Sequence, residues 1–473
     1  MATVHVMVGV PGSGKSTFSK KLSEEKGIEI ISSDKVRDMH PDWDEKNTFP
    51  EVYRLISEIL KTGRDVILDA TNINSNIRKN ISLRLNPYKV AYDLVAYYFP
   101  VKYSVCYERI KRRNEIGRDR YFPLDVLAHY YNIMEAPSKD EGFKEVVVVE
   151  QMNLEEIKNE LLKGVIDRRD QGYAFYYSDK LGEINEAKGE KLIGIGDKID
   201  LDTNFRLASV SKQFIAYSIY LLIKNKKLDF DTKLNDIFYV GEYAKDIKII
   251  NLLNHTSGLL DYEDMDHTDE QVLDKDVLEF VKGCDHLYFD VGSKYQYSNT
   301  AYVILGLIIE EVSKTKLGDF IKENIFDKVG MTNSIVNYQG ITKIKNRCYG
   351  HLVVNDKIEM HDQYWCSATI GDGGIYSNVN DLKKWVDYLY NMYSDDELFF
   401  KANILPNGEN SEYALGIRHV KRKGLDIIYH CGESIGFNTI IGFVPSQNKR
   451  FILLTNLGNH SCDKVLKNLI EIL

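Results

Sequence analysis

The chain has 473 residues, of which 44% are hydrophobic and 28% are charged, and its formal net charge is −9. This length exceeds what one hydrophobic core usually organises and predicts two or three domains, while the composition excludes a disordered chain. Residues 1–165 contain 25 basic and 25 acidic side chains, so the negative charge lies in the remainder and argues against nucleic acid binding there.

The sequence begins MATVHVMVGVPGSGKS, with no basic segment ahead of its apolar residues, which predicts a first β-strand and not a signal peptide. No apolar run approaches the ~18 residues that a membrane span needs. The six cysteines are scattered without Cys-x-x-Cys spacing, which disfavours a disulfide framework or a zinc site. We therefore expect a cytoplasmic protein without membrane contact, and the sequence indicates no particular protein partner.

Apolar runs alternate with helical patterns up to about residue 150. The runs are VHVMVGV, DVILDA, DLVAYYF and KEVVVVE. This alternation predicts an α/β domain, with a parallel sheet and crossover helices. A helical pattern over residues 153–165 could close this domain or open the next. We place the boundary at residue 164, which gives domains 1–164 and 165–473.

The segment Gly9-Val-Pro-Gly-Ser-Gly-Lys-Ser16 matches the phosphate-loop pattern G-x-x-x-x-G-K-[ST] between a predicted strand and a predicted helix. Its glycines let backbone N–H groups surround phosphates, and the helix N-terminus adds its dipole. Lys15 would neutralise the β- and γ-phosphates, and the Ser16 hydroxyl would hold Mg²⁺. A glycine-rich turn without a ligand is the alternative. The predicted residues for ATP and Mg²⁺ are Gly9, Gly12, Ser13, Gly14, Lys15, Ser16 and Thr17.

Three later stretches concern the acceptor of the phosphate. Asp34 and Arg37 follow a second strand, and Asp69-Ala-Thr-Asn72 ends a third one. Both strand ends would meet at the carboxyl edge of the sheet, where open α/β folds bind ligands. Residues 109–120 carry six basic side chains and could form a lid. Taken singly, these features could equally be a helix cap, a turn and a solvated helix face.

In this order, and followed by Pro137 and Glu141-Gly-Phe143, the motifs resemble the kinase domain of the polynucleotide kinase family over residues 2–150. The resemblance implies an ATP-dependent transfer to a hydroxyl group. The acceptor could be a polynucleotide 5′-hydroxyl, although this kinase fold also phosphorylates sugars, nucleotide-sugars and antibiotics.

The same resemblance implies roles for individual residues. Asp34 would accept the proton of the acceptor hydroxyl, and Arg37 would position the acceptor. Asp69 would organise the metal or acceptor site. Arg113 and Arg118 would stabilise the phosphate during transfer, although the spacing after Asn114 departs from the family pattern.

From Tyr173 onward the pattern changes. Short strands, YAFYYS and KLIGIG, precede a helical block from about Val210 to Lys224. The last eighty residues contain the strands LDIIYHCG, FNTIIGFVP and KRFILLTNLG, and the helix CDKVLKNLIEIL. Strands joined by short turns predict an antiparallel sheet flanked by helices, an α+β domain.

Ser209-Val-Ser-Lys212 places a serine and a lysine three residues apart at the start of the helical block. Residues with this spacing lie on one face of a helix, so the Lys212 ammonium would lie beside the Ser209 hydroxyl. A serine is a poor nucleophile without such a partner. Alone, the pattern is common and usually marks two surface residues.

Two further motifs follow, Tyr297-Ser-Asn299 and His430-Cys-Gly432. This order resembles that of the serine β-lactamases and penicillin-binding proteins. The segments around His255 and Gly373-Gly374 resemble the class C-like group with its D-aminopeptidases and esterases, from Tyr173 to the end of the chain.

The second resemblance implies that Ser209 is acylated, that Lys212 and Tyr297 share the proton transfers, and that Asn299 orients the substrate amide. The backbone N–H groups of Ser209 and Glu433 would form the oxyanion hole. We expect His255 to fix its loop.

His430 belongs to the implied catalytic set, but it stands where β-lactamases usually carry lysine. Neutral imidazole holds no full charge at pH 7, which weakens recognition of a substrate carboxylate. We therefore expect a small ester or amide substrate for an esterase, amidase or D-peptidase.

The sequence thus predicts a bifunctional enzyme, a kinase followed by a serine hydrolase. The alternative is a second domain that acts as an acylated sensor or a non-catalytic binding module and regulates a small-molecule kinase.

Overall fold

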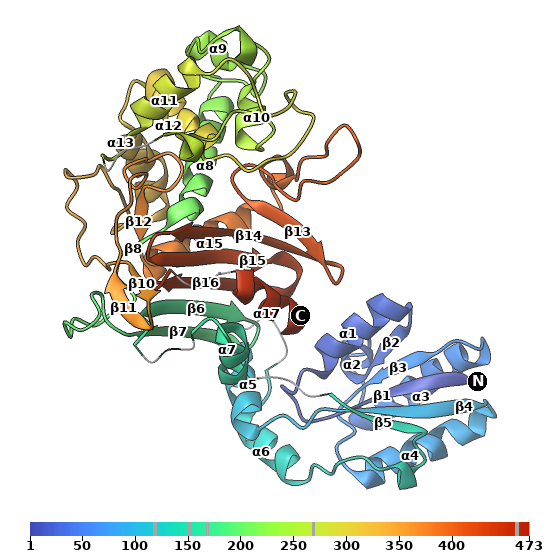
Figure 1. Ribbon diagram of the computed structural model, residues 1–473. Coiled ribbons are helices and arrows are strands. Elements are labelled where there is room, and N and C mark those ends of the chain that lie inside the picture. Colours follow the sequence, from blue (N-terminus) through green and yellow to red (C-terminus); the bar gives the residue numbers. More distant parts are fainter. Residues whose placement is uncertain are drawn as a thin grey trace. The chain divides into compact units, whose positions relative to one another are not determined.

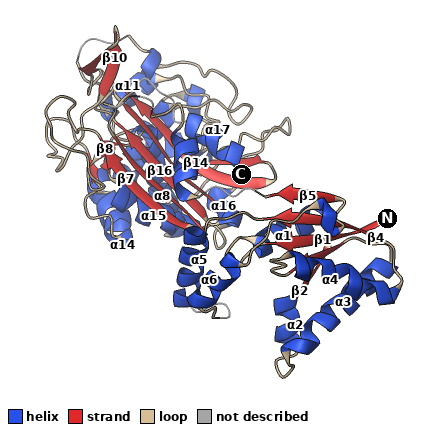
Figure 2. Ribbon diagram, turned by 90° about the horizontal axis from the view of Figure 1, so that it is seen from below, coloured by secondary structure: helices blue, strands red, loops and turns tan. Residues whose placement is uncertain are grey.

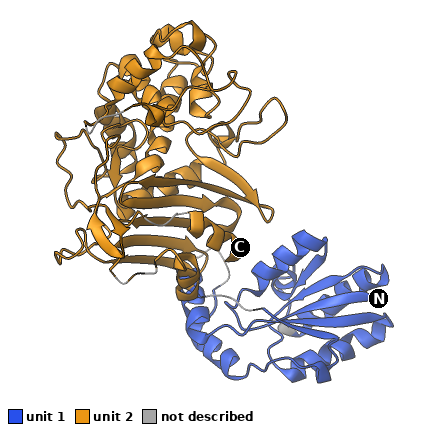
Figure 3. Cartoon of the chain, viewed as in Figure 1, with its two compact units in different colours: residues 1–153 blue, residues 154–473 orange. Residues whose placement is uncertain are grey.

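The computed structural model describes residues 1–116, 121–149, 153–166, 168, 170–266, 270–458 and 463–472. The chain forms two compact units, Met1–Asn153 and Leu154–Leu473 (Figure 3).

The division between the units differs from the boundary expected at residue 164. Helix α7 (Leu154–Leu162) packs against helix α17 (Asp463–Ile472) in the second unit. Asn468 donates hydrogen bonds to the carbonyl oxygens of Leu161 and Lys163, at 3.0 and 2.9 Å. These contacts hold the end of α7 to the end of the chain.

Within the described ranges, the first unit is built on five parallel strands, as the α/β prediction required (Figure 1). In spatial order they are β2 (Glu29–Ser32), β3 (Val66–Asp69), β1 (Ala2–Val8), β4 (Tyr92–Tyr98) and β5 (Glu145–Val148). Ser32 lies opposite Asp69 in the register of β2 and β3. The carboxyl ends of these two strands therefore meet at one edge of the sheet.

Helices cover both faces of this sheet, because its central strand is apolar on both sides. Val4, Val6 and Val8 of β1 pack with residues of α3 and α4, whereas Met7 packs with residues of α1, α5 and α6. The helices are α1 (Lys15–Lys26), α2 (Ser33–Met39), α3 (Glu45–Lys61), α4 (Ser75–Leu85), α5 (Tyr103–Ile116) and α6 (Leu124–Asn132). Burial on both faces is the usual condition of a parallel sheet.

The second unit contains an antiparallel sheet whose described strands number six, confirming the predicted α+β fold. In spatial order they are β13 (Arg418–Arg422), β14 (Leu425–Ser434), β15 (Phe437–Val444), β16 (Lys449–Thr455), β6 (Tyr173–Asp179) and β7 (Gly182–Lys188). Two smaller sheets comprise β8 (Phe205–Arg206), β12 (Ile375–Ser377) and β9 (Ile335–Val336), and β10 (His351–Val354) and β11 (Lys357–Met360).

Helices of the second unit pack around this sheet, and Figure 1 shows α9–α13 above it. Figure 2 shows the chain from below, with helices in blue and strands in red. Helices α8 and α12 pack against each other in the main core, and α15 packs on β15, β16 and β6. The helices after α7 are α8 (Lys212–Lys224), α9 (Leu234–Ile237), α10 (Ile249–Leu253), α11 (Asp274–Gly283), α12 (Asn299–Ser313), α13 (Leu317–Ile321), α14 (Asp327–Val329), α15 (Val379–Met392), α16 (Glu397–Phe400) and α17.

The expected strand KLIGIG, residues 191–196, is wrong, because this segment is a loop. Gly194 and Gly196 adopt left-handed φ angles of 92° and 87°. Their N–H groups donate to one carboxylate oxygen of Glu190, at 2.8 and 3.1 Å. The strand that follows β6 and pairs with it is instead β7. Its side chains are exposed or half-buried, so no fully buried apolar face marks it in the sequence.

No helix in the described part of the chain combines the length and the apolar character needed to cross a membrane.

Candidate active sites in the two units

Ser209 lies in a short 3₁₀ turn (Ala208–Ser211) that leads into α8, and not in the α-helix itself. Residues i and i+3 eclipse each other in a 3₁₀ turn, so Ser209 Oγ lies 3.0 Å from Lys212 Nζ. Ala208 has a left-handed φ of +48°, a conformation that costs a non-glycine residue about 1–3 kcal/mol. The preceding residue, Leu207, is held on both sides, by Ile375 O at 2.9 Å and by Thr439 Oγ1 at 2.8 Å.

Lys212 is completely buried, and its ammonium group donates three hydrogen bonds. The acceptors are Ser209 Oγ at 3.0 Å, Asn299 Oδ1 at 2.8 Å and the carbonyl oxygen of Asp372 at 2.8 Å. An ammonium has three N–H donors, so this set uses all of them. Asp372 was not predicted, because its contact runs through the backbone and lies 160 residues away in the sequence.

Asn299 begins α12 and links Lys212 to an acidic loop. Its Nδ2 donates to Glu263 Oε1 at 2.9 Å, and its backbone N–H donates to Asp261 Oδ2 at 3.1 Å. Loss of hydration, and then the charges of Asp372 and Asp261, raise the pKa of Glu263 to about 7. Both polar groups of the Asn299 side chain therefore face protein partners, and the carboxylate of Glu263 determines which way the amide points.

Aromatic rings form one wall of this site. The Tyr297 ring centroid lies 5.0 Å from Lys212 Nζ and 4.4 Å from the ring of His255. His255 also contacts the ring of Tyr413 at 4.4 Å, and its Nδ1 accepts the backbone N–H of Ser298 at 3.1 Å. Burial holds the pKa of His255 well below its usual value. A neutral histidine with these contacts fixes the segment that carries Tyr297, as expected from the sequence.

His430 on β14 is buried, and both of its ring nitrogens have partners. Nδ1 lies 2.6 Å from the carbonyl oxygen of Cys431, which can only accept, so we assign the ring proton to Nδ1. Nε2 then accepts the hydroxyl proton of Tyr413 at 2.9 Å. Burial lowers the pKa of His430 to about 3. In this arrangement His430 positions Tyr413, whereas the sequence placed it among the catalytic residues.

Strand β14 approaches Ser209 through Gly432. A Cβ atom on this glycine would lie 2.1 Å from Leu207 O and 3.1 Å from Ser209 N, so no other residue fits. This approach brings the strand that carries Glu433 alongside the backbone amide of Ser209. The Glu433 side chain itself is exposed.

In the first unit, the phosphate loop lies between β1 and α1. Gly12 and Gly14 have left-handed φ angles of 79° and 90°. A Cβ on Gly12 would also lie 2.9 Å from the carbonyl oxygen of Cys106. Lys15 is buried, and its Nζ donates to Val10 O at 2.8 Å. Burial lowers the pKa of Lys15 to about 8.

The two predicted acidic residues come to the same edge of the sheet as Lys15. Asp69 ends β3 and its carboxylate accepts a hydrogen bond from Ser16, which opposes the rise that burial causes in its pKa. Asp34 pairs with Arg37 at 2.7 Å on α2, and its charge acts on both Lys15 and Asp69. The phosphate loop follows β1, Asp69 ends β3, and Asp34 follows β2. These three strands are neighbours in the sheet, so the three groups lie at the same edge.

Basic residues of α5 face the phosphate loop. The positive charge of Arg113 acts on Lys15 and contributes to the lowering of its pKa. Arg109, the first residue of the basic stretch expected to form a lid, lies on α5 and donates to Gly12 O at 2.9 Å. Arg118 lies outside the described residues.

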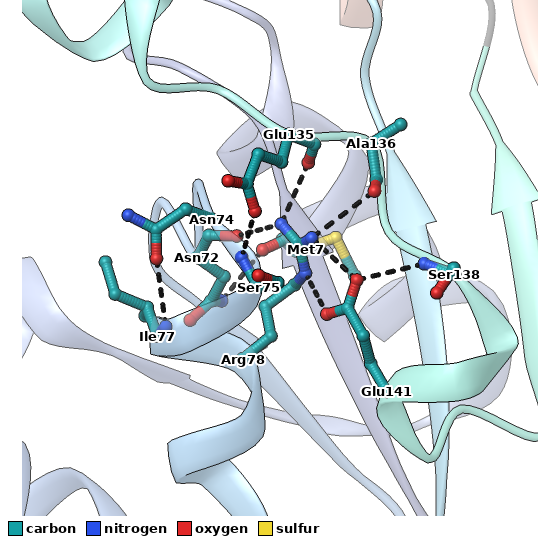
Figure 4. Close-up of polar contacts among 10 residues, drawn as sticks. All are labelled: Met7, Asn72, Asn74, Ser75, Ile77, Arg78, Glu135, Ala136, Ser138 and Glu141. Atoms are coloured by element: carbon teal, nitrogen blue, oxygen red, sulfur yellow. Dashed lines mark hydrogen bonds and ion pairs between the residues drawn. The ribbon is translucent and has the colours of Figure 1, made fainter.

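The buried side chain of Arg78 connects two further motifs of the first unit (Figure 4). Arg78 donates from Nε and Nη2 to the two carboxylate oxygens of Glu141, at 2.6 and 2.8 Å. It also donates to the carbonyl oxygens of Asn72 and Glu135, at 3.1 and 2.9 Å. The Asn72 side chain in turn donates to Met7 O at 2.8 Å. The D-A-T-N and E-G-F motifs are therefore tied together by Arg78, which no local pattern marked.

The loop and its neighbours fit a nucleotide with Mg²⁺. The glycine positions leave a cradle without Cβ atoms, and Ser16 and Asp69 supply the hard oxygen donors that Mg²⁺ prefers. Among the described residues, no three His, Cys, Asp or Glu side chains gather into a metal-binding group. Such an ion would accordingly depend on phosphate oxygens as well as on the protein.

Comparisons with known proteins match both halves of the chain. A family model described as Beta-lactamase matches residues 172–470, and one described as AAA domain matches residues 4–137. Both predicted resemblances, to a P-loop kinase-like domain and to a β-lactamase-like domain, are thereby confirmed.

Penicillin-binding protein 4* of Bacillus subtilis is 31% identical over 288 residues, which are 55% of this chain and 62% of that relative. The chain thus spans less than two thirds of this relative. The octameric penicillin-binding protein homologue from Pyrococcus abyssi superposes with a TM-score of 0.59 and 19% identity, over 66% of this chain and 76% of the other. D-amino acid amidase from Ochrobactrum anthropi SV3 superposes with a TM-score of 0.57 and 20% identity, over 67% of this chain and 97% of the other. These two structures establish the fold of the second unit.

Proposed function

Because this chain belongs to the Beta-lactamase family through residues 172–470, we propose that its second unit is a serine hydrolase that is acylated at Ser209. The observation that carries the proposal is the triple contact of Lys212, which places a buried ammonium 3.0 Å from Ser209 Oγ. Such a charge in a water-poor site stabilises the negative charge that develops during attack on a carbonyl group.

In the proposed reaction, Ser209 Oγ attacks the carbonyl carbon of an ester or amide. We assign the transfer of the Ser209 proton to Lys212 and Tyr297 together, because the Tyr297 ring lies beside the Lys212 side-chain nitrogen that contacts Ser209 Oγ. Tyr297 then returns this proton to the departing alcohol or amine. Water attacks the acyl-serine with Tyr297 as base, which restores Ser209. The amides of Ser209 and Glu433 would hold the oxyanion.

The first unit is proposed to transfer phosphate from ATP to a hydroxyl group. Residues Gly9–Thr17 would hold the nucleotide, and Ser16 with Asp69 would face Mg²⁺, which supplies charge neutralisation when bound. Asp34 would take the acceptor's proton, and Arg37 would position the acceptor. Arg113, and Arg118 beyond the described ranges, would stabilise the transferred group. The support is the common location of Lys15, Asp69 and Asp34 at one sheet edge.

A transfer assay tests this second activity. γ-labelled ATP is offered with 5′-hydroxyl oligonucleotides, nucleosides and sugar nucleotides, and label in the oligonucleotide supports a polynucleotide acceptor. Lys15→Ala is the control for contaminating kinases. Absence of label in every acceptor class, with ATP binding intact, would contradict the kinase proposal.

Burst kinetics separate a hydrolase from an acylated sensor. With a chromogenic ester, steady turnover after the first equivalent supports hydrolysis. One equivalent of product followed by no turnover would instead support the sensor.

A further inference from the structure

Arg206, on β8, carries a buried guanidinium group whose charge no described carboxylate balances. The residue is only 4% exposed. Its Nη2 donates to the carbonyl oxygen of Ser367 at 2.8 Å, but Nε and Nη1 are buried without a partner among the described residues. A charge removed from water is costly unless it is both paired and hydrogen-bonded, so these two nitrogens point to a ligand.

A second guanidinium group, that of Arg347, lies beside the same tyrosine. Arg206 lies opposite Tyr376 in the register of β8 and β12. The Cζ of Arg347 lies 5.3 Å from the ring centroid of Tyr376, and its Nη2 donates to the Tyr376 hydroxyl at 3.3 Å. Burial raises the pKa of Tyr376, and the charges of Arg206 and Arg347 both oppose this rise. The two cations therefore act on one buried side chain.

Asp362 is the carboxylate that meets this pair, and both of its oxygens already have partners. It forms an ion pair with Arg347. Its Oδ1 accepts the backbone N–H of Gly350 at 2.9 Å, and its Oδ2 accepts a hydrogen bond from Gln363 Nε2 at 3.0 Å. Arg347 Nε is nevertheless buried without a described partner. Two positive charges thus stand against one negative charge, and three arginine nitrogens are left unmatched within the described ranges.

The excess positive charge indicates an anion and not water alone. Water molecules could accept hydrogen bonds from both arginines, but they would leave this charge uncompensated. A small monovalent anion accepts several charge-assisted hydrogen bonds and also cancels the charge. Because Arg206 is almost completely buried, a compact ion suits this position better than a group of a substrate does. Chloride meets both conditions.

We propose that Arg206 and Arg347 bind a chloride ion, which stabilises the small sheet of β8, β12 and β9 next to the candidate acyl site. Arg206 is three residues before Ser209, and Leu207 between them donates its N–H to the carbonyl oxygen of Ile375 on β12 at 2.9 Å. An ion held at Arg206 therefore supports the strand that leads into the Ser209 turn. The site goes beyond both proposed activities, and its tests depend on neither of them.

Bromide, which replaces chloride and scatters X-rays anomalously, tests the site in the native chain. We expect crystals grown with sodium bromide to show an anomalous peak in contact with the guanidinium groups of both Arg206 and Arg347. Peaks confined to exposed lysines or to helix ends would mark an adventitious ion only and would overturn the proposal. Density for water alone between the two arginines would contradict it as well.

Thermal unfolding measures the effect of the ion in solution. Calorimetric scans compare sodium chloride with sodium gluconate at equal ionic strength, which holds general screening constant. We expect chloride to raise the Tm of the second unit by about 1–3 °C in a saturable way, and Arg206→Met to abolish this difference. Arg422→Met, at an arginine that is paired with Glu412, is the matched control and should keep the difference. An absent chloride effect, or an equal one in Arg206→Met, refutes the site, and the bromide experiment decides if that variant does not fold.

Discussion

Lys15 and Lys212, a buried lysine from the candidate site of each unit, differ in how their surroundings are built. Lys15 is the first residue of α1, directly after the phosphate loop, and donates to a backbone oxygen five residues away. Burial lowers its pKa to about 8. Lys212 donates to a serine three residues before it, and to an asparagine and a carbonyl group that lie 87 and 160 residues away in the sequence. A phosphate can be held by one turn and a helix end, whereas an acyl site needs several groups that converge from different elements.

The largest expected effect separates the two sites. Ser209→Ala should lower hydrolysis of p-nitrophenyl acetate by at least about 10³-fold, because no other group can form the acyl intermediate. Phosphoryl transfer by the first unit should be unchanged. Steady-state rates and labelling by a serine-directed phosphonate measure this. An adduct mapped by mass spectrometry to a residue other than Ser209 would remove it as the nucleophile.

Lys15→Ala should have the opposite pattern. We expect phosphoryl transfer to fall by about 10³-fold, because the γ-phosphate loses its main cation, while ester hydrolysis stays within about twofold. Nucleotide binding by calorimetry and transfer of γ-label are the measurements. Near-normal transfer by the variant would show that the phosphate loop is not catalytic.

Asp34→Asn tests the base at the edge of the sheet. The amide cannot accept the acceptor's proton, so transfer should drop about 10²–10⁴-fold while ATP binding is kept. Asp38→Asn, on the same helix one turn further along, is the matched control. Should both variants retain the native kcat, Asp34 would be reduced to a structural partner of Arg37.

The smallest expected effect concerns pH and stability. The folded pKa of Glu263 is about 7, above the usual 4.5, so between these values the folded state binds more protons than the unfolded state. The contribution of Glu263 to the free energy of unfolding is therefore greatest at low pH and falls as pH rises from about 4.5 to 7.

Glu263→Gln should remove this dependence. Relative to the native protein, its free energy of unfolding should increase from pH 5 to pH 7, by no more than about 1 kcal/mol because the carboxylate is partly exposed. Urea unfolding at several pH values measures the difference, with the neighbouring exposed residue in Asp264→Asn as control. A pH-independent difference would contradict the raised pKa.

Local sequence patterns were enough to predict both folds and most of the candidate site residues. The complete phosphate loop, the alternation of apolar runs and helices, and the order of the Ser209, Tyr297 and His430 motifs predicted both folds. They succeed because each depends on neighbouring residues: glycines that permit left-handed turns, and side chains three residues apart that meet on one turn. The loop at residues 191–196 was mistaken for a strand, because its conformation depends on hydrogen bonds to Glu190 as well as on its own residues.

Only the tertiary structure decided what surrounds those motifs. Arg78 joins Asn72 to Glu141 across the first unit, and Asp372 and Glu263 complete the surroundings of Lys212 and Asn299. Tyr413 contacts both His255 and His430, although these residues come from segments far apart in the sequence. Contacts of this kind depend on how distant segments pack, and a buried charge or hydrogen-bonding group can be supplied from any of them. The sequence therefore predicted the family of each unit, and packing decided which polar and charged groups lie around the predicted residues.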